Sequence, residues 1–304
     1  MGGGSWELSD WGEYSAKTAT KPRHKIYASK SMDKDMNPFG VKVREARDNE
    51  ENKETTPIIV CLDVSGSMGH IAEYMAKTGL GVMVNEILKR DTIPDPAVLV
   101  MANDDIAVGD SAALQVGQFE SDIGITTWLE KIYLEFGGGG NDCESYDLPY
   151  YFALKHTVTD AFEKRNKAGV IITIGDERPP VHLTPAQIRT VTGDIVQSNV
   201  LFKDLIQQIR PMYTPYHILV TQGANIGDEE ATRKAWAALL GQNVLSLNDY
   251  EKIAETIVTA LEIECGKDSH AVIGSWDKTT SLVLSETFKD FTPAVASKEG
   301  VSRF

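Results

Sequence analysis

Apolar runs alternate with amphipathic stretches along the middle of the chain. The runs predict buried strands at 58–63, 97–102, 114–119, 170–175, 217–221 and 244–247. Apolar residues at helical spacing predict helices between them, including stretches at 148–165, 184–210, 228–240 and 249–264. This alternation favours the α/β class, with a doubly wound, mostly parallel sheet and helices on both faces. The short polar link between the second and third runs predicts one antiparallel strand at an edge of the sheet.

The two ends of the chain do not show this alternation. Residues 1–56 are polar with scattered aromatics and close on a charged linker, and 265–304 show some strand character in SLVLSETF (281–288). We therefore predict an N-terminal arm and linker (1–56), a central domain (57–264) and a C-terminal arm (265–304). The arms carry aromatics that look exposed, such as Trp6, Trp11, Trp276 and Phe288. Such arms either wrap around their own domain or clasp neighbours in an oligomer, and the sequence leaves both open.

Charge and cysteine content narrow the function classes. The formal net charge is −14 and no cluster of Lys and Arg offsets it, so nucleic acid is not an expected partner. The three cysteines, Cys61, Cys143 and Cys265, form no CxxC pair, which indicates neither a zinc site nor a disulfide framework. No apolar segment has the length of a membrane helix, and the first residues do not resemble a signal peptide. We expect a cytoplasmic protein without a membrane partner.

Polar residues follow two of the predicted strands at their carboxyl ends. The first strand leads into D-V-S-G-S, which supplies Asp63, Ser65 and Ser67, and the strand at 170–175 leads into Asp176. The carboxyl ends of parallel strands share one rim of the sheet, where ligands of such folds bind. Carboxylate and hydroxyl oxygens suit a hard cation such as Mg²⁺. We predict a divalent-cation site here; the alternative is that Asp63 and the serines only cap the following helix.

A glycine-rich loop, G-G-G-G-N-D at 137–142, lies between these two motifs and is followed by C-E-S-Y. The D-V-S-G-S motif, this loop and I-G-D occur in the order found in von Willebrand factor A (VWA) domains, which residues 57–264 resemble. The resemblance implies a Rossmann-like VWA fold with one antiparallel edge strand. It also implies a metal-ion-dependent adhesion site (MIDAS) with these metal-site residues: Asp63, Ser65, Ser67 and Asp176.

The second loop departs from the pattern of the family. Many VWA domains have a Thr there, whereas this chain resembles a bacterial and protist variant with GGG-(D/N)-x-x-E. We assign Asn141 to the Thr position, with Glu144 as the alternative. An ion held mainly by neutral hydroxyls stays electrophilic and attracts a carboxylate of a partner. If Glu144 binds the ion, it supplies that charge internally, and we then expect weaker or gated recognition of an acidic partner residue.

These features together predict a divalent-cation-dependent protein-interaction module of an intracellular assembly, without a catalytic role. Mg²⁺ is the expected ion, with Mn²⁺ or Ca²⁺ as alternatives, and an acidic residue of the partner would complete its shell. The resemblance implies partners such as an AAA+ ATPase. The alternatives are a structural subunit assembled through the arms, or a hydrolase in which the ion activates water. A hydrolase needs a general base, for which the chain offers Asp142, Glu144, Glu177 and His70.

Overall fold

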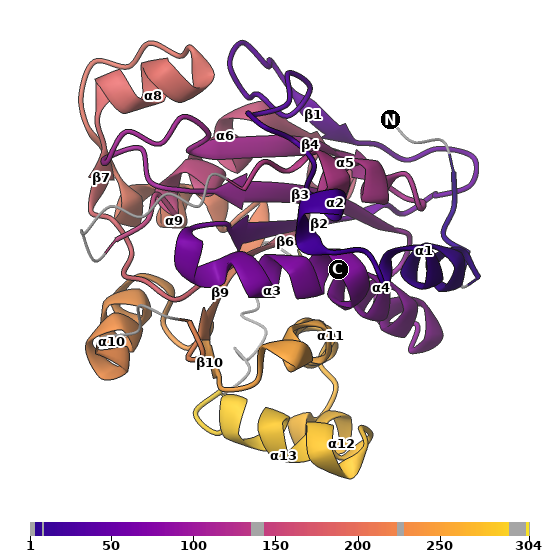
Figure 1. Cartoon of the computed structure of the whole chain (residues 1–304). Coiled ribbons are helices and arrows are strands. Elements are labelled where there is room, and N and C mark those ends of the chain that lie inside the picture. The colour runs from indigo at the N-terminus through magenta and orange to yellow at the C-terminus, as the bar shows by residue number, and fades with distance from the viewer. Residues whose placement is uncertain (1–3, 8, 135–142, 224–227, 292–301, 304) are drawn as a thin grey trace.

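A computed structural model describes residues 4–7, 9–134, 143–223, 228–291 and 302–303. Its centre is a sheet whose neighbouring strands, in spatial order, are β10 (Val244–Leu247), β9 (Tyr213–Val220), β6 (Lys167–Gly175), β2 (Thr56–Asp63), β3 (Pro96–Asn103) and β4 (Leu114–Glu120). These strands run parallel except for the edge pair β3 and β4, which is antiparallel. A short strand, β11 (Ser302–Arg303), pairs with the start of β6. The predicted α/β class, with its single antiparallel edge strand, is confirmed (Figure 1).

Helices cover both faces of the sheet because alternate residues of its strands point to opposite sides. In β2, Ile58, Val60 and Leu62 enter one half of the core, and Ile59 and Cys61 enter the other. The first half is closed by α3 (Gly69–Tyr74), a π-helical turn (Met75–Gly79), α4 (Leu80–Lys89), α5 (Ile125–Lys131) and α11 (Ile253–Glu264). The second half is closed by α6 (Asp147–His156), α8 (Pro185–Thr192), α9 (Phe202–Ile209) and α10 (Glu229–Leu240). Burial on both faces explains why the central strands are continuously apolar in sequence.

The N-terminal arm packs on the central sheet and its helices. Its helix α1 (Asp10–Thr18) places Trp11 against α4, where a Cβ on Gly81 would lie 2.8 Å from the indole ring. The glycine therefore makes room for the tryptophan, which is only 3% exposed. After α2 (Arg23–Ile26) the arm passes the outer edge of β4, where the Val116 amide donates to the Met36 carbonyl over 2.8 Å. The sequence suggested that the aromatic residues of this arm are exposed. In the structure, however, Trp11 is buried and Trp6 is partly buried against the same core.

The strand character predicted for 281–288 is wrong, because this segment is helical. It forms α13 (Lys278–Thr287), which follows α12 (Ser269–Gly274) and packs on α11. The Asp277 side chain caps α13 by accepting from the amides of Thr279 and Thr280 over 3.0 and 3.2 Å. Leu284 and Phe288, four residues apart, are buried in the same core as α11. The letters S-L-V-L-S contain a short apolar run that is also found in buried strands, but the cap and the four-residue spacing belong to a helix.

The helix predicted over 148–165 is divided in the structure. The α6 helix ends at His156, the β-branched run Thr157–Thr159 forms β5, and α7 (Asp160–Arg165) follows. The β5 strand pairs with β1 (Arg44–Ala46) from the N-terminal arm, which is why the helix cannot continue. A short strand, β8 (Val200–Leu201), likewise interrupts the partly helical segment predicted over 184–210, and it pairs with β7 (His182–Leu183) just before that segment. No helix in the described ranges is long and apolar enough to cross a membrane.

Candidate metal centre

Asp63 and Asp176 meet at one rim of the sheet. Asp63 is the last residue of β2, and Asp176 directly follows β6. These strands are parallel neighbours with Leu62 paired to Ile174, so their carboxyl ends lie side by side. Both aspartates are about as buried as core residues, each with 1% of its surface exposed. The sequence prediction that the two carboxylates emerge at the same edge agrees with this placement.

The two serines of the first loop connect these carboxylates. Ser65 and Ser67 lie around a 3₁₀ turn (Gly66–Met68) that leads from β2 into α3. The Ser65 amide donates to Asp63 Oδ1 over 2.9 Å, and the hydroxyls of Ser65 and Ser67 are 3.1 Å apart. The Ser67 hydroxyl donates to Asp176 Oδ1 over 3.2 Å. Four of the residues named from sequence are therefore joined by one continuous string of hydrogen bonds.

The spacing of these oxygens fits a small divalent cation. Mg²⁺ holds oxygens about 2.1 Å away in an octahedron, so neighbouring ligands lie about 3 Å apart. The separations of 3.1 Å between the serine hydroxyls and 3.2 Å from Ser67 to Asp176 are close to that octahedral edge. Within the described ranges, no three side chains of His, Cys, Asp or Glu are gathered to hold a metal ion. The donor set here is of another kind, with two carboxylates and two neutral hydroxyls.

The electrostatics of the pair also suit a cation. Burial, followed by the negative charge of Asp176, raises the pKa of Asp63 to about 7, although hydrogen bonds from Ser65 and Tyr146 act in the opposite direction. No Lys or Arg in the described part of the chain forms an ion pair with Asp63. Two buried carboxylates side by side repel each other when both are ionised. A divalent ion between them would remove that repulsion.

Tyr146 holds Asp63 in place and was not foreseen from the sequence. Its buried hydroxyl donates to Asp63 Oδ2 over 2.6 Å, and its ring packs against His217 and Trp236 with centroids 5.3 and 5.2 Å away. The indole of Trp236 in turn donates to the Glu177 carbonyl over 2.9 Å, next to Asp176. An aromatic cluster on the α10 side of the sheet thereby fixes both acidic loops.

Two glycines make space for these groups. A Cβ on Gly175 would collide with the Tyr146 hydroxyl, and a Cβ on Gly223 would collide with the carboxylate of Asp176. Gly175 is the glycine of I-G-D, so its presence in that motif has a steric reason. Gly223 follows β9 and carries no signal that sequence reasoning could have connected to Asp176.

Glu144 lies near the centre but outside its string of hydrogen bonds. The residue is 4% exposed, and its Oε2 has no hydrogen-bond partner within the described ranges. Burial, then the charges of Asp63 and Asp104, raise its pKa to about 11. The adjacent Ser145 hydroxyl bonds instead to the loop that follows β3, where it donates to Asp105 Oδ1 over 3.0 Å. Asn141, the other residue considered for the Thr position, falls outside the described residues, as does Asp142.

A further acidic loop borders the site and was missed in the sequence. It follows β3 and contains Asp104, Asp105 and Asp110. Burial and the charge of Asp110 raise the pKa of Asp104 to about 8. The loop follows the strand beside β2, so the topology brings a third strand end to the same rim. The rim therefore gathers several carboxyl groups, and their raised pKa values reflect burial and mutual repulsion, the second of which a bound cation would relieve.

The remaining candidates for a general base do not join the string. His70 is exposed and packs its ring edge-on against Tyr250, with centroids 5.0 Å apart. Glu177 is buried next to Asp176, and its amide donates to the Tyr146 hydroxyl over 3.4 Å. His156 and Asp160 lie four residues apart in the stretch predicted as one helix, but they have different partners: His156 bonds to Asp194 over 2.8 Å and Asp160 pairs with Arg47 over 2.8 Å.

Comparison with known proteins gives only distant structural likenesses. No known protein family and no curated protein matches the sequence. The pilus adhesin SpaC of Lactobacillus rhamnosus GG is similar with a TM-score of 0.47 and 11% identity, over 71% of this chain and 31% of the adhesin. A von Willebrand factor type A protein of Catenulispora acidiphila gives a TM-score of 0.42 and 19% identity, over 71% of this chain and 44% of that one. BatB of Bacteroides thetaiotaomicron gives 0.42 and 13%, over 70% of this chain and 100% of BatB.

The chain thus spans about a third of the adhesin that it resembles. The TM-scores are all below 0.5, and the fold class rests on the strand order of the sheet. The protein is a doubly wound α/β protein whose carboxyl rim brings together Asp63, Ser65, Ser67 and Asp176.

Proposed function

We propose that the chain is a divalent-cation-dependent protein-interaction module that binds its partner at the carboxyl rim. The observation that supports this most is the string of hydrogen bonds that joins the two buried carboxylates through Ser65 and Ser67. The proposed metal-binding residues are Asp63, Ser65, Ser67 and Asp176, with Asn141 in the second loop and Mg²⁺ as the ion. Mn²⁺ and Ca²⁺ are alternatives to be compared in the same experiments.

The chain's own residues would hold the ion and leave a place for the partner. When bound, the ion supplies an electrophilic centre that attracts an acidic side chain. Tyr146 keeps Asp63 oriented, and the 3₁₀ turn after β2 keeps both hydroxyls at the rim. Without the ion, burial and neighbouring charges raise the pKa values of Glu144 and Asp104 to about 11 and about 8, so both carboxyls stay largely protonated near pH 7 and offer an incoming carboxylate no positive charge. The partner's acidic residue would then complete the shell only in the metal-loaded state.

Metal-dependent stabilisation tests the proposal directly. A ligand at 100 times its Kd stabilises the folded state by about 2.7 kcal/mol, which for a chain of this size raises the unfolding midpoint by roughly 5 °C. We expect Mg²⁺ to produce such a shift in the full chain and not in Asp63→Asn or Ser67→Ala. The matched control is Glu230→Gln, because Glu230 is an exposed carboxylate at the start of α10 that pairs with Lys234 and is none of the proposed ligands. Equal shifts in Asp63→Asn and the unchanged protein would overturn the proposed site.

Glu144 is tested by the same titration. If its carboxylate binds the ion, Glu144→Ala weakens Mg²⁺ binding and strengthens the response to an acidic partner residue. If Asn141 takes that position instead, Asn141→Ala weakens Mg²⁺ binding and Glu144→Ala does not. Equal Mg²⁺ affinities of Glu144→Ala and the unchanged chain would exclude Glu144 as a ligand.

We further propose that the partner belongs to an intracellular, cytoplasmic assembly, with an AAA+ ATPase among the candidates. The test is capture of a protein partner by the full chain in Mg²⁺, with loss of capture in EDTA and in Asp63→Ala. Capture that is unchanged by EDTA would place the interaction elsewhere on the molecule. No residue in the described ranges is arranged to favour the hydrolase over the interaction module.

A further inference from the structure

The two edges of the central sheet differ in the main-chain hydrogen bonds that the rest of the described chain makes to them. At the β4 edge, the N-terminal arm approaches the strand and the Val116 amide donates to the Met36 carbonyl. At the opposite edge lies β10, a short apolar strand that reads V-L-S-L. An uncovered edge offers main-chain donors and acceptors to another extended chain.

The hydrogen-bond pattern shows which groups of β10 face outward. The strand is parallel to β9, and the amides of His217 and Thr221 donate to the carbonyls of Asn243 and Leu247 over 2.9 Å each. In a parallel ladder, both main-chain groups of every second residue face the same neighbour. The amides and carbonyls of Val244 and Ser246 therefore point away from β9. Within the described ranges, neither residue makes a main-chain hydrogen bond outside the ladder.

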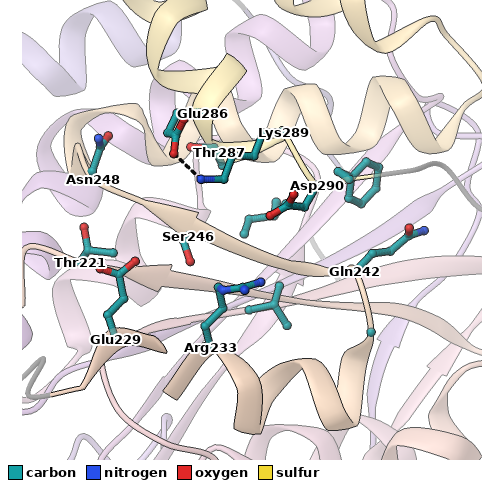
Figure 2. A pocket seen from close by; sticks show the side chains of 14 residues that line it. Thr221, Glu229, Arg233, Gln242, Ser246, Asn248, Glu286, Thr287, Lys289 and Asp290 are labelled. Carbon is teal, nitrogen blue, oxygen red and sulfur yellow. Dashed lines mark hydrogen bonds and ion pairs between the residues drawn. The ribbon is translucent and has the colours of Figure 1, made fainter. Parts of the chain in front are cut away.

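A cavity of about 320 Å³ lies along this outward edge, between α10 and α13. Val244 and Ser246 form part of its lining, and the Ser246 hydroxyl is buried without a hydrogen-bond partner in the described part of the chain. Figure 2 shows Arg233 extending from α10 toward the middle of the cavity, with Glu286 and Lys289 on the opposite, α13 side. The two helices thus form the walls of a groove whose floor is the edge strand.

The charges in the groove select the occupant. Arg233 makes no ion pair within the described ranges, whereas its helix neighbour Lys234 is paired with Glu230 over 2.6 Å. Lys289 is already neutralised by Glu286 over 2.5 Å, so Arg233 carries the unmatched positive charge. Glu229 and Asp290 also line the groove, and they disfavour an occupant with several acidic groups. One acidic side chain in an otherwise neutral segment satisfies Arg233 and avoids that repulsion.

We propose that the β10 edge binds an extended segment of a partner protein as an additional strand, with a single Asp or Glu side chain of that segment at Arg233. The main-chain groups of Val244 and Ser246 supply up to four hydrogen bonds, and the Ser246 hydroxyl gains a partner. This site lies at the sheet edge and contains none of the proposed metal ligands. Binding there is independent of the ion.

The experiment begins with a library of random ten-residue peptides displayed on phage and selected on the full chain in EDTA. The strongest sequence is then synthesised with both ends blocked. We expect alternating β-branched residues with one acidic residue, and protection of the Val244 and Ser246 amides from hydrogen exchange when the peptide is bound. Replacement of the peptide's acidic residue by Lys is expected to weaken binding at least about tenfold.

Two substitutions in the protein complete the test. Ser246→Pro removes an outward amide and leaves the ladder to β9 intact, because proline is tolerated where an edge strand faces solvent. Arg233→Glu reverses the charge in the groove, and Lys234→Glu is its control on the same helix. We expect at least about tenfold weaker binding for the first two variants and unchanged binding for the control. If Ser246→Pro does not fold, Arg233→Glu against Lys234→Glu still decides.

Three results would overturn the proposal. The first is that no selected peptide is sensitive to Ser246→Pro or Arg233→Glu. The second is that the Val244 and Ser246 amides gain no protection, which would mean that the peptide does not pair with the strand. The third is a dimer of the chain that Ser246→Pro dissociates, because the edge would then belong to a second copy. A loss of Mg²⁺ binding in the Asp63 variants would not affect any of these outcomes.

Discussion

The hydrogen bond from Tyr146 to Asp63 gives a sharp test of how the rim is held together. Tyr146→Phe removes one hydroxyl and keeps the ring that packs on His217 and Trp236. The lost bond, 2.6 Å long, ends on a buried carboxylate, and bonds to charged groups contribute about 1.5–3 kcal/mol to stability. We therefore expect the free energy of unfolding to fall by about 2 kcal/mol in EDTA at pH 8, where Asp63 is ionised.

Tyr213→Phe is the matched control. Tyr213 is equally buried, and its hydroxyl lies 2.8 Å from that of Thr157, so the bond lost is between neutral groups. Such bonds contribute about 0.5–1.5 kcal/mol. Urea unfolding of both variants, followed by far-UV circular dichroism, measures the difference. If Tyr146→Phe costs no more than Tyr213→Phe, the reasoning that a charged acceptor anchors this rim is refuted.

Three further predictions follow from described contacts. Without metal, the free energy of unfolding should fall as the pH rises from about 4 to about 7. The folded state keeps the Asp63 proton up to a pKa of about 7, whereas the unfolded state releases it near the ordinary pKa of 3.8. Asp63→Asn should flatten this slope, which urea titrations at several pH values measure. Leu284→Ala should cost about 2–5 kcal/mol and unfold in one transition with the rest of the chain, whereas a separate or absent loss would show that α13 is not part of the core. Gly223→Ala should displace the Asp176 carboxylate and abolish Mg²⁺-dependent stabilisation, and an unchanged Mg²⁺ response would contradict the placement of that side chain.

The strands and the rim could be predicted from the sequence because their signals are local. The run I-I-V-C-L-D is apolar up to the residue that leaves the sheet, so both the strand and the position of Asp63 are read from neighbouring letters. The same holds for V-I-I-T-I-G and Asp176. Parallel pairing then places the two carboxylates at one edge without further information.

The parts that sequence reasoning missed depend on contacts between distant segments. Tyr146 reaches Asp63 across 83 positions, and nothing in its local sequence marks it as a hydrogen-bond donor to that residue. The acidic loop after β3 was passed over because its aspartates lack the spacing of a known motif. In α13, the apolar run fits a strand or a helix equally well, and the contact that decides for the helix is the cap by Asp277.

The contact between Trp11 and Gly81 of α4 affects where the chain can be cut to make a stable fragment. A boundary drawn at residue 57 follows composition, but it cuts through a packed contact between the arm and the α4 helix. A fragment that starts there would expose a bare helical surface around Gly81 and, on the β4 side, an amide at Val116 deprived of its acceptor. An exposed apolar patch and an unpaired strand edge both promote association in water, so we expect the fragment that starts at residue 57 to self-associate. The N-terminal arm therefore covers apolar and edge surfaces of the domain that follows it.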